Sequence, residues 1–143
     1  LSAVPELPAG GAEPALAGRH FLVAEDNLIN AEILCELLQM YGAQSIRKAD
    51  GIQTVRAFTE APPGTFDAIL MDIRMPGMNG YEATRAIRAL ERSDAVGIPI
   101  IAMTANAFPE DVQAALDAGM DAHVAKPIDF PLFLATLSHL LNG

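Results

Sequence analysis

From Ala68 to Gly80 the chain reads AILMDIRMPGMNG, a short apolar run that ends in an acid and leads into a loop of turn residues. The apolar run is too short for a typical helix, so it is predicted to be a buried strand with Asp72 at its carboxyl end. Beyond the loop, Ala83, Ile87 and Leu90 recur at the spacing of a helix face. The stretch therefore predicts a strand, a loop with a polar group at its start, and a helix.

The same strand-and-helix pattern continues on both sides of this stretch. Further strands are predicted at His20–Ala24, Ile98–Met103 and Ala122–Ala125, with a weaker candidate at Gln44–Ala49. Helical spacing of apolar residues joins them: Ile29, Ile33, Leu34, Leu37, Leu38 and Tyr41; Ile52, Val55 and Phe58; Val112, Ala115 and Leu116 after Pro109; and Phe133, Leu134, Leu137, Leu140 and Leu141. Such alternation predicts an α/β protein with a doubly wound parallel sheet. Five units in about 125 residues suit a five-stranded flavodoxin-like (βα)5 fold with strand order 2-1-3-4-5.

The first 18 residues have a different composition. Pro, Gly and Ala fill 11 of these positions, and no apolar periodicity is visible. We therefore expect a flexible linker over residues 1–18 and one domain over residues 19–143. The chain begins with Leu1 rather than Met, so we expect it to be part of a longer protein.

Composition narrows the classes of function. Hydrophobic residues make up 51% of the chain, which is enough for a packed core. The net charge of −9 disfavours direct contact with nucleic acid. No signal peptide and no apolar run of membrane-spanning length is visible, so we expect no membrane contact by this domain. Cys35 is the only cysteine, which excludes an internal disulfide.

Polar residues follow four of the predicted strands. Glu25 and Asp26 follow the first, Asp72 the third, Thr104 the fourth and Lys126 the fifth. Parallel strands bring their carboxyl ends to one edge of the sheet, where ligands bind in this fold class. Any one acid alone would be interpreted as a solvated loop residue or a helix cap. Three acids in one pocket repel one another, and a hard divalent cation such as Mg²⁺ removes that conflict.

The lysine and the threonine give the predicted pocket a second property. Lys126 can bind a phosphoryl oxygen as a point charge, and Thr104 can donate its hydroxyl to the same group. With them, Asp72 is suited to act as a carboxylate nucleophile toward phosphorus. Taken alone, Lys126 would be interpreted as a surface cation, and Thr104 as an ordinary strand-end threonine.

Four segments resemble the motifs of response-regulator receiver domains of two-component systems. They occur in the order found in that family, with 46, 32 and 22 residues between Asp26, Asp72, Thr104 and Lys126. The resemblance covers residues 19–143 and rests on these segments: Ala24-Glu25-Asp26-Asn27 with Asn30, Met71 to Gly80, Ala102-Met103-Thr104-Ala105-Asn106-Ala107, and Ala125-Lys126-Pro127.

The resemblance implies a set of metal ligands. Asp26 and Asp72 would contact Mg²⁺ directly, and Glu25 would do so through water. The backbone carbonyl of Arg74 would supply a further ligand.

The resemblance also implies roles in phosphoryl transfer. Asp72 would be the phosphoacceptor, Thr104 would bind the phosphoryl group and shift when it arrives, and Lys126 would pair with Asp72 or its phosphate. The bond between Lys126 and Pro127 is cis in family members. His123 departs from the family, because many receivers carry Tyr or Phe there, and this puts the usual aromatic switch in doubt.

Residues 25–30 (EDNLIN) and 104–107 (TANA) resemble the receivers of hybrid sensor histidine kinases. A receiver in such a phosphorelay would accept a phosphoryl group from a phosphohistidine. It would then switch conformation or pass the phosphate to a histidine phosphotransfer partner, with self-catalysed uptake and autodephosphorylation. The implied partners are the dimerisation and phosphotransfer helices of a histidine kinase, and the implied location is cytoplasmic, including tethering to a membrane-bound kinase.

Two alternative functions stay open from the sequence. A pseudo-receiver would serve only as a protein-interaction module, although the complete set of site residues argues against it. A phosphohydrolase of the haloacid dehalogenase type usually has a second Asp two residues after its nucleophile, where this chain has Arg74. No glycine-rich nucleotide-binding motif is present.

Overall fold

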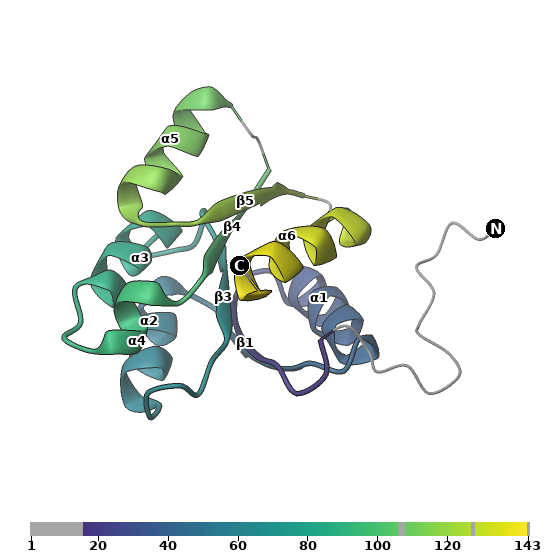
Figure 1. Cartoon of the computed structure of the whole chain (residues 1–143). Coiled ribbons are helices and arrows are strands. Elements are labelled where there is room, and N and C mark those ends of the chain that lie inside the picture. Colours follow the sequence, from purple (N-terminus) through teal and green to yellow (C-terminus); the bar gives the residue numbers. More distant parts are fainter. Residues whose placement is uncertain (1–15, 106–107, 127, 143) are drawn as a thin grey trace.

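The computed structural model describes residues 16–105, 108–126 and 128–142, which form one parallel sheet between two layers of helices (Figure 1). The strand order β2-β1-β3-β4-β5 confirms the predicted doubly wound, flavodoxin-like topology. The elements in chain order are β1 (His20–Ala24), α1 (Leu28–Met40), β2 (Gln44–Lys48), α2 (Gly51–Glu60), β3 (Ala68–Asp72), α3 (Gly80–Arg88), α4 (Ser93–Gly97), β4 (Ile100–Thr104), α5 (Pro109–Ala118), β5 (Ala122–Ala125) and α6 (Phe130–Asn142).

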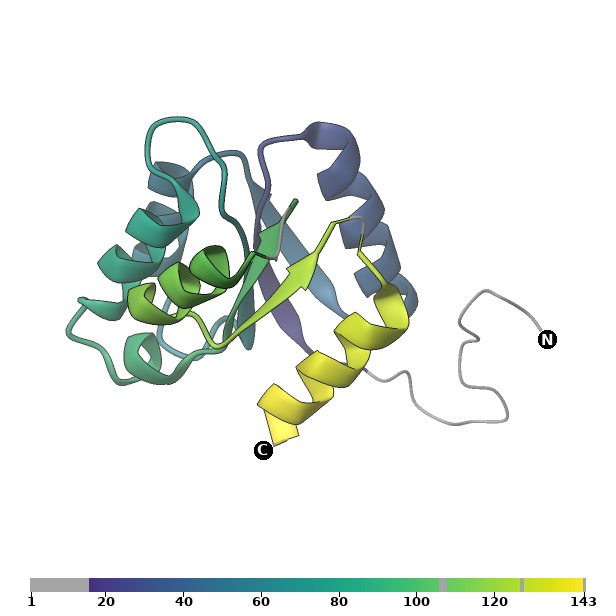
Figure 2. The ribbon, with the colours of Figure 1, turned by 90° about the horizontal axis from the view of Figure 1, so that it is seen from above.

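Two apolar cores separate the sheet from its helices. Helices α1 and α6 lie on one face, and α2 to α5 lie on the other (Figure 2). Side chains alternate along a strand, so in β1 Phe21 and Val23 join the first core while Leu22 and Ala24 join the second. The central strands β3 and β4 are buried along their whole length. This explains why both appear in the sequence as continuous apolar runs.

Helix α4 was not predicted. Its five residues contain only one buried side chain, Ala95, so no apolar periodicity marks it in the sequence. The strand predicted from Ile98 begins instead at Ile100, because Ile98 is the C-terminal cap of α4. Strand β4 then runs to Thr104, one residue beyond the predicted end.

The buried face of α1 differs from the prediction. Ala31, Leu34 and Leu38 are buried, whereas Ile29 and Ile33 are 66% and 53% exposed. The six predicted apolar positions, from Ile29 to Tyr41, span an arc of about 180° at 100° per residue, which is more than the sheet can cover. The uncovered part leaves isoleucine side chains on the surface of the first helix.

Leu16 packs with the domain although it falls within the predicted linker. Its side chain is 2% exposed and belongs to the core beneath α1 and α6, and its backbone N–H donates to the carbonyl of Tyr41 at 2.8 Å. The packed domain therefore extends upstream of its predicted start at Arg19 and includes Leu16. The rest of the linker prediction, residues 1–15, lies outside the described residues.

Helices α1 and α6 contain 13 residues each. Within the described part of the chain, no helix combines the length and the apolar composition required to cross a bilayer.

Candidate active site

Four strand ends meet at one edge of the sheet, as predicted. Glu25 follows β1, Asp72 and Thr104 end β3 and β4, and Lys126 follows β5. The register of the parallel strands places these ends side by side, with Asp72 opposite Met103. Together they line a hollow of about 300 Å³, whose walls include Glu25, Asp26, Asn27, Asn30, Asp72, Ile73, Arg74, Thr104, Ala105 and Lys126.

Three carboxylates converge in this hollow. Glu25, Asp26 and Asp72 each offer an oxygen, and these oxygens all lie within 4.8 Å of one another. Glu25 and Asp72 are buried, whereas Asp26 is exposed. Negative charges at this separation and burial repel strongly, so the cluster is suited to a bound cation.

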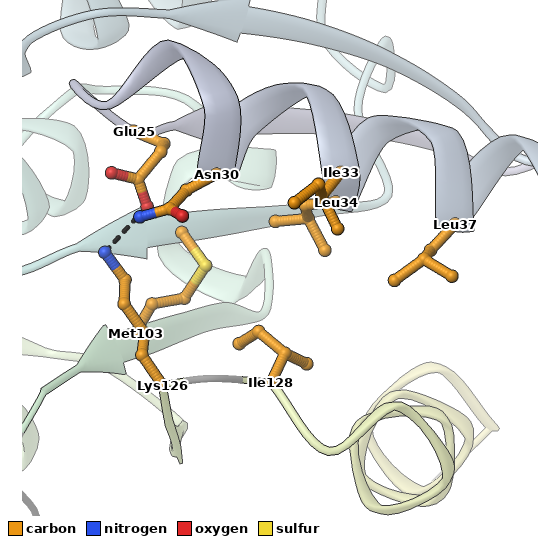
Figure 3. Close-up of a pocket in the computed structure, with 8 residues that line it drawn as sticks. All are labelled: Glu25, Asn30, Ile33, Leu34, Leu37, Met103, Lys126 and Ile128. Carbon is orange, nitrogen blue, oxygen red and sulfur yellow. Dashed lines mark ion pairs between the residues drawn. The ribbon is translucent and has the colours of Figure 1, made fainter. Parts of the chain in front are cut away.

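Lys126 bridges the two buried carboxylates. Its Nζ atom lies 2.7 Å from Oε1 of Glu25 and 3.0 Å from Oδ2 of Asp72 (Figure 3 shows the pair with Glu25). Burial by itself would lower the pKa of Lys126, but its hydrogen bonds with the two acids raise that pKa above its ordinary value. One ammonium cannot balance three carboxylates, so the hollow keeps an excess of negative charge.

The acidity of Asp72 reflects the same imbalance. Burial raises the pKa of its carboxyl to about 6, and the charge of Glu25 acts in the same direction while Lys126 opposes both. A cation bound among the three acids would favour the ionised form. The ionised form is the one that can act as a nucleophile.

Backbone groups orient the two buried acids. The N–H of Arg74 donates to Oδ1 of Asp72 at 3.2 Å, and the N–H of Asn27 donates to Oε2 of Glu25 at 3.1 Å. The side chain of Asn27 also caps α1 by accepting from the N–H of Asn30. Each of these two carboxylates is therefore held on both oxygens by groups of the protein itself.

Arg47 in β2 was missed from the sequence. Its Nε and Nη2 atoms donate to the backbone carbonyls of Glu25 and Asp26, at 2.9 Å and 3.1 Å. In the sequence Arg47 was only one cation within a weak strand candidate. Its role depends on the pairing of β1 with β2, in which Arg47 lies opposite Val23.

Three further residues singled out in the sequence are Thr104, His123 and Pro127. Thr104 is 9% exposed and borders the same hollow as Asp72. His123 is exposed on β5 and borders a shallow depression together with Thr104 and Asp111. The predicted cis bond involves Pro127, which lies outside the described residues.

An apolar groove opens next to the hollow. It has a volume of about 180 Å³ and runs between α1 and the segment after β5, with Ile33, Leu37 and Ile128 among its walls (Figure 3). The ion pair of Glu25 and Lys126 closes its inner end. The groove thus connects the exposed apolar part of α1 with the acidic site.

The donor set fits a hard divalent cation. Carboxylate and carbonyl oxygens suit Mg²⁺, and the described residues offer three carboxylates with an uncompensated charge. In chemical terms, a buried carboxylate beside an ammonium and a cation site can attack an electrophilic phosphorus, because the charge on the transferring oxygens is neutralised.

Fold and site together define an α/β protein of the flavodoxin-like type with an acidic, lysine-bearing site at the strand ends. The chain belongs to the response regulator receiver domain family, whose family model matches residues 21–138. It is thus a receiver domain of two-component signalling, as its motifs predicted.

Individual relatives agree with this assignment. The peroxide stress-activated histidine kinase mak1 of Schizosaccharomyces pombe is 37% identical over 129 residues, which are 90% of this chain and 8% of mak1. Hybrid signal transduction histidine kinase I of Dictyostelium discoideum is 42% identical over 110 residues, 76% of this chain and 6% of that kinase. The chain therefore spans less than a tenth of the length of either relative.

A solved structure supports the same fold. The receiver domain of the sensor histidine kinase PA1611 from Pseudomonas aeruginosa is 39% identical and superposes with a TM-score of 0.79. The match covers 89% of this chain and all of that domain. That structure has a magnesium ion coordinated in its active site cleft.

Proposed function

We propose that this receiver domain accepts a phosphoryl group from a phosphohistidine onto the carboxylate of Asp72. An oxygen of Asp72 forms the new bond to phosphorus, and the bond from phosphorus to the histidine nitrogen breaks with its electron pair on nitrogen. The product is an acyl phosphate on Asp72 and a free imidazole. The observation that carries the proposal is the buried carboxylate of Asp72, held by Lys126 and by the N–H of Arg74 within the acidic cluster.

Asp26, Asp72, Glu25 and the backbone carbonyl of Arg74 would hold Mg²⁺, with Glu25 acting through water. When bound, the ion neutralises negative charge on the transferring oxygens. The fit of the three carboxylates supports this assignment, as does the magnesium in the related PA1611 receiver.

Lys126 and Thr104 would hold the phosphoryl group once it has arrived. The ammonium of Lys126 lies 3.0 Å from Asp72, so it can follow a phosphoryl oxygen with a small movement of a flexible side chain. Thr104 borders the same hollow and carries a hydroxyl donor. Movement of Thr104 toward the phosphate would shift the start of α5, which would transmit the signal.

Helix α1 would form the docking face for the histidine-bearing helices of a kinase or a phosphotransfer protein. Ile29 and Ile33 are exposed on this helix, and the groove beside Ile33 ends at Glu25 and Lys126. Exposed apolar side chains that border a polar active site favour a protein partner over a small metabolite. Both relatives are named as histidine kinases, and the name of the Dictyostelium discoideum relative favours a place within a hybrid histidine kinase.

Labelling with radioactive acetyl phosphate tests the acceptor role directly. Wild-type protein is expected to take up label with Mg²⁺ and to take up none after chelation. A phosphotransfer profile against histidine kinases and phosphotransfer proteins then identifies the partner. Absence of label under all conditions would instead favour the pseudo-receiver, which binds partners without phosphate.

A further inference from the structure

We infer that Arg47 is a positioning residue that sets the metal affinity of the site, although its side chain is not one of the proposed ligands. This inference rests on the proposed Mg²⁺ site at Glu25, Asp26 and Asp72. It concerns a residue of β2, the strand at one end of the sheet, which contributes none of the proposed ligands.

The first observation is the geometry of the guanidinium. Nε of Arg47 donates to the carbonyl of Glu25 at 2.9 Å, and Nη2 donates to the carbonyl of Asp26 at 3.1 Å. Two donors in one rigid plane fix two successive peptide groups at once. The backbone that carries both acids is thereby tied to β2.

The second observation is the contrast between the two acids. Glu25 is buried and receives hydrogen bonds on both carboxylate oxygens, from Lys126 and from the N–H of Asn27. Asp26 is exposed, so neighbouring packing restricts its side chain less. The contact from Arg47 to its carbonyl therefore restrains the backbone of an acid that the resemblance makes a direct ligand.

The third observation concerns the opposite arm of the site. The loop that carries Arg74 rests on the start of α2, since a Cβ placed on Gly51 would overlap the carbonyl oxygen of Met78. Arg47 and Gly51 are four residues apart, at the end of β2 and the beginning of α2. One short segment thus supports both loops that carry the proposed ligands.

Positioning matters for this ion in particular. Mg²⁺ requires near-ideal octahedral geometry at short distances, whereas Ca²⁺ accepts longer and more variable ones. Loss of a group that orients a metal ligand typically costs 10-fold to 100-fold in metal affinity. Loosening the pair of acids should consequently weaken Mg²⁺ binding more than Ca²⁺ binding.

An effect of the charge of Arg47 and an effect of its hydrogen bonds predict opposite changes in Mg²⁺ affinity when Arg47 is replaced. Replacement of a cation near an acidic site by a neutral residue should strengthen binding of a divalent cation if only charge matters. Loss of positioning should weaken it. Arg47→Lys keeps the charge but cannot reproduce the planar fork, so positioning predicts weaker binding for this variant too.

The experiment measures Mg²⁺ and Ca²⁺ dissociation constants by calorimetry for wild type, Arg47→Gln and Arg47→Lys. Arg56→Gln is the matched control. Arg56 lies in α2, and its replacement removes the same positive charge as Arg47→Gln. We expect Mg²⁺ binding to weaken by about 10-fold in both Arg47 variants, with a smaller loss for Ca²⁺. Arg56→Gln should stay within about 2-fold of wild type or bind slightly more tightly.

A second pair of variants tests the other arm. Gly51→Ala should show the same selective loss of Mg²⁺ affinity, whereas Gly97→Ala should not, because a Cβ on Gly97 meets no atom within 4 Å.

Thermal unfolding without metal identifies any variant that fails to fold, and Arg47→Lys is the mildest change. Equal Mg²⁺ affinity in Arg47→Lys, Arg47→Gln and wild type would overturn the inference. Wild-type protein that binds no Mg²⁺ would overturn the proposed function itself.

Discussion

The Nζ atom of Lys126 lies closer to Glu25, at 2.7 Å, than to the proposed phosphoacceptor Asp72, at 3.0 Å. The ammonium is thus shared between two buried acids, Glu25 just after β1 and Asp72 at the end of β3. Sharing keeps Lys126 at the site before a phosphoryl group arrives, and it leaves the lysine free to exchange one carboxylate for a phosphoryl oxygen. Several properties of the site depend on this pair of contacts.

Replacement of Asp72 by Asn should abolish phosphoryl uptake at the site. The amide has nearly the same shape as the carboxylate but is not a nucleophile of comparable strength. Labelling with acetyl phosphate, followed by peptide mapping, provides the measurement. Full labelling of the Asp72→Asn variant would refute the assignment of the phosphoacceptor.

Replacement of Lys126 by Ala should slow phosphoryl uptake by about 100-fold, the usual effect of removing one charged donor from a transition state. The variant should still bind Mg²⁺, because the three carboxylates remain. Uptake rates from acetyl phosphate at saturating Mg²⁺ measure the effect. A Lys126→Arg variant keeps the charge and should lose less, and wild-type rates in Lys126→Ala would exclude a role for the ammonium.

Without metal, the stability of the domain should depend on pH through Asp72. Its pKa is raised from 3.8 to about 6, so the folded state binds more protons than the unfolded state between these values. The free energy of unfolding should therefore fall as pH rises through this window, by about 2 to 3 kcal/mol, and level off above it.

Urea unfolding in EDTA from pH 4.5 to 7.5 measures this dependence, with Asp72→Asn as the reference. The free energy difference between the two proteins should grow with pH in favour of the variant. Added Mg²⁺ should stabilise wild type more at pH 7.5 than at pH 5, since the ion binds the ionised acids. A difference independent of pH would contradict the raised pKa.

Arg74→Ala should shorten the lifetime of the acyl phosphate. Arg74 borders the hollow beside Asp72, and we expect its side chain to limit the approach of water to the acyl phosphate. Its backbone N–H, which binds Asp72, is retained in the variant. Loss of label after removal of the donor measures the lifetime, and Arg74→Lys separates charge from shape. An unchanged lifetime together with unchanged transfer would remove this role.

Ile33→Glu should impair transfer from a phosphohistidine partner without affecting uptake from acetyl phosphate. Ile33 is exposed on α1 and lines the apolar groove, so a charge there would be buried against a docked helix. We expect transfer to slow by about 10-fold or more, as for a central interface residue. Val96→Glu is the control, because Val96 is 70% exposed on α4, across the sheet from α1. Equal effects of the two variants would place the docking face elsewhere.

The pattern of apolar residues close together in the chain predicted most of this fold. Strands such as Ala68–Met71 were recognisable because a buried parallel strand requires a continuous apolar run, and a run of four or five residues leaves few alternatives. Parallel pairing brings the ends of these strands together, so the meeting of Asp26, Asp72, Thr104 and Lys126 at one edge was predictable from the sequence. The short helix α4 was missed because only Ala95 faces the core.

The sequence by itself determined the alternation of strands and helices, and hence the edge of the sheet where the polar residues meet. Only the tertiary structure decided which part of α1 is buried, how Lys126 is shared between Glu25 and Asp72, and that Arg47 binds the carbonyls of Glu25 and Asp26. The reason is physical. Apolar periodicity acts between residues close in the chain, whereas these contacts depend on the register and packing of segments that are distant in it.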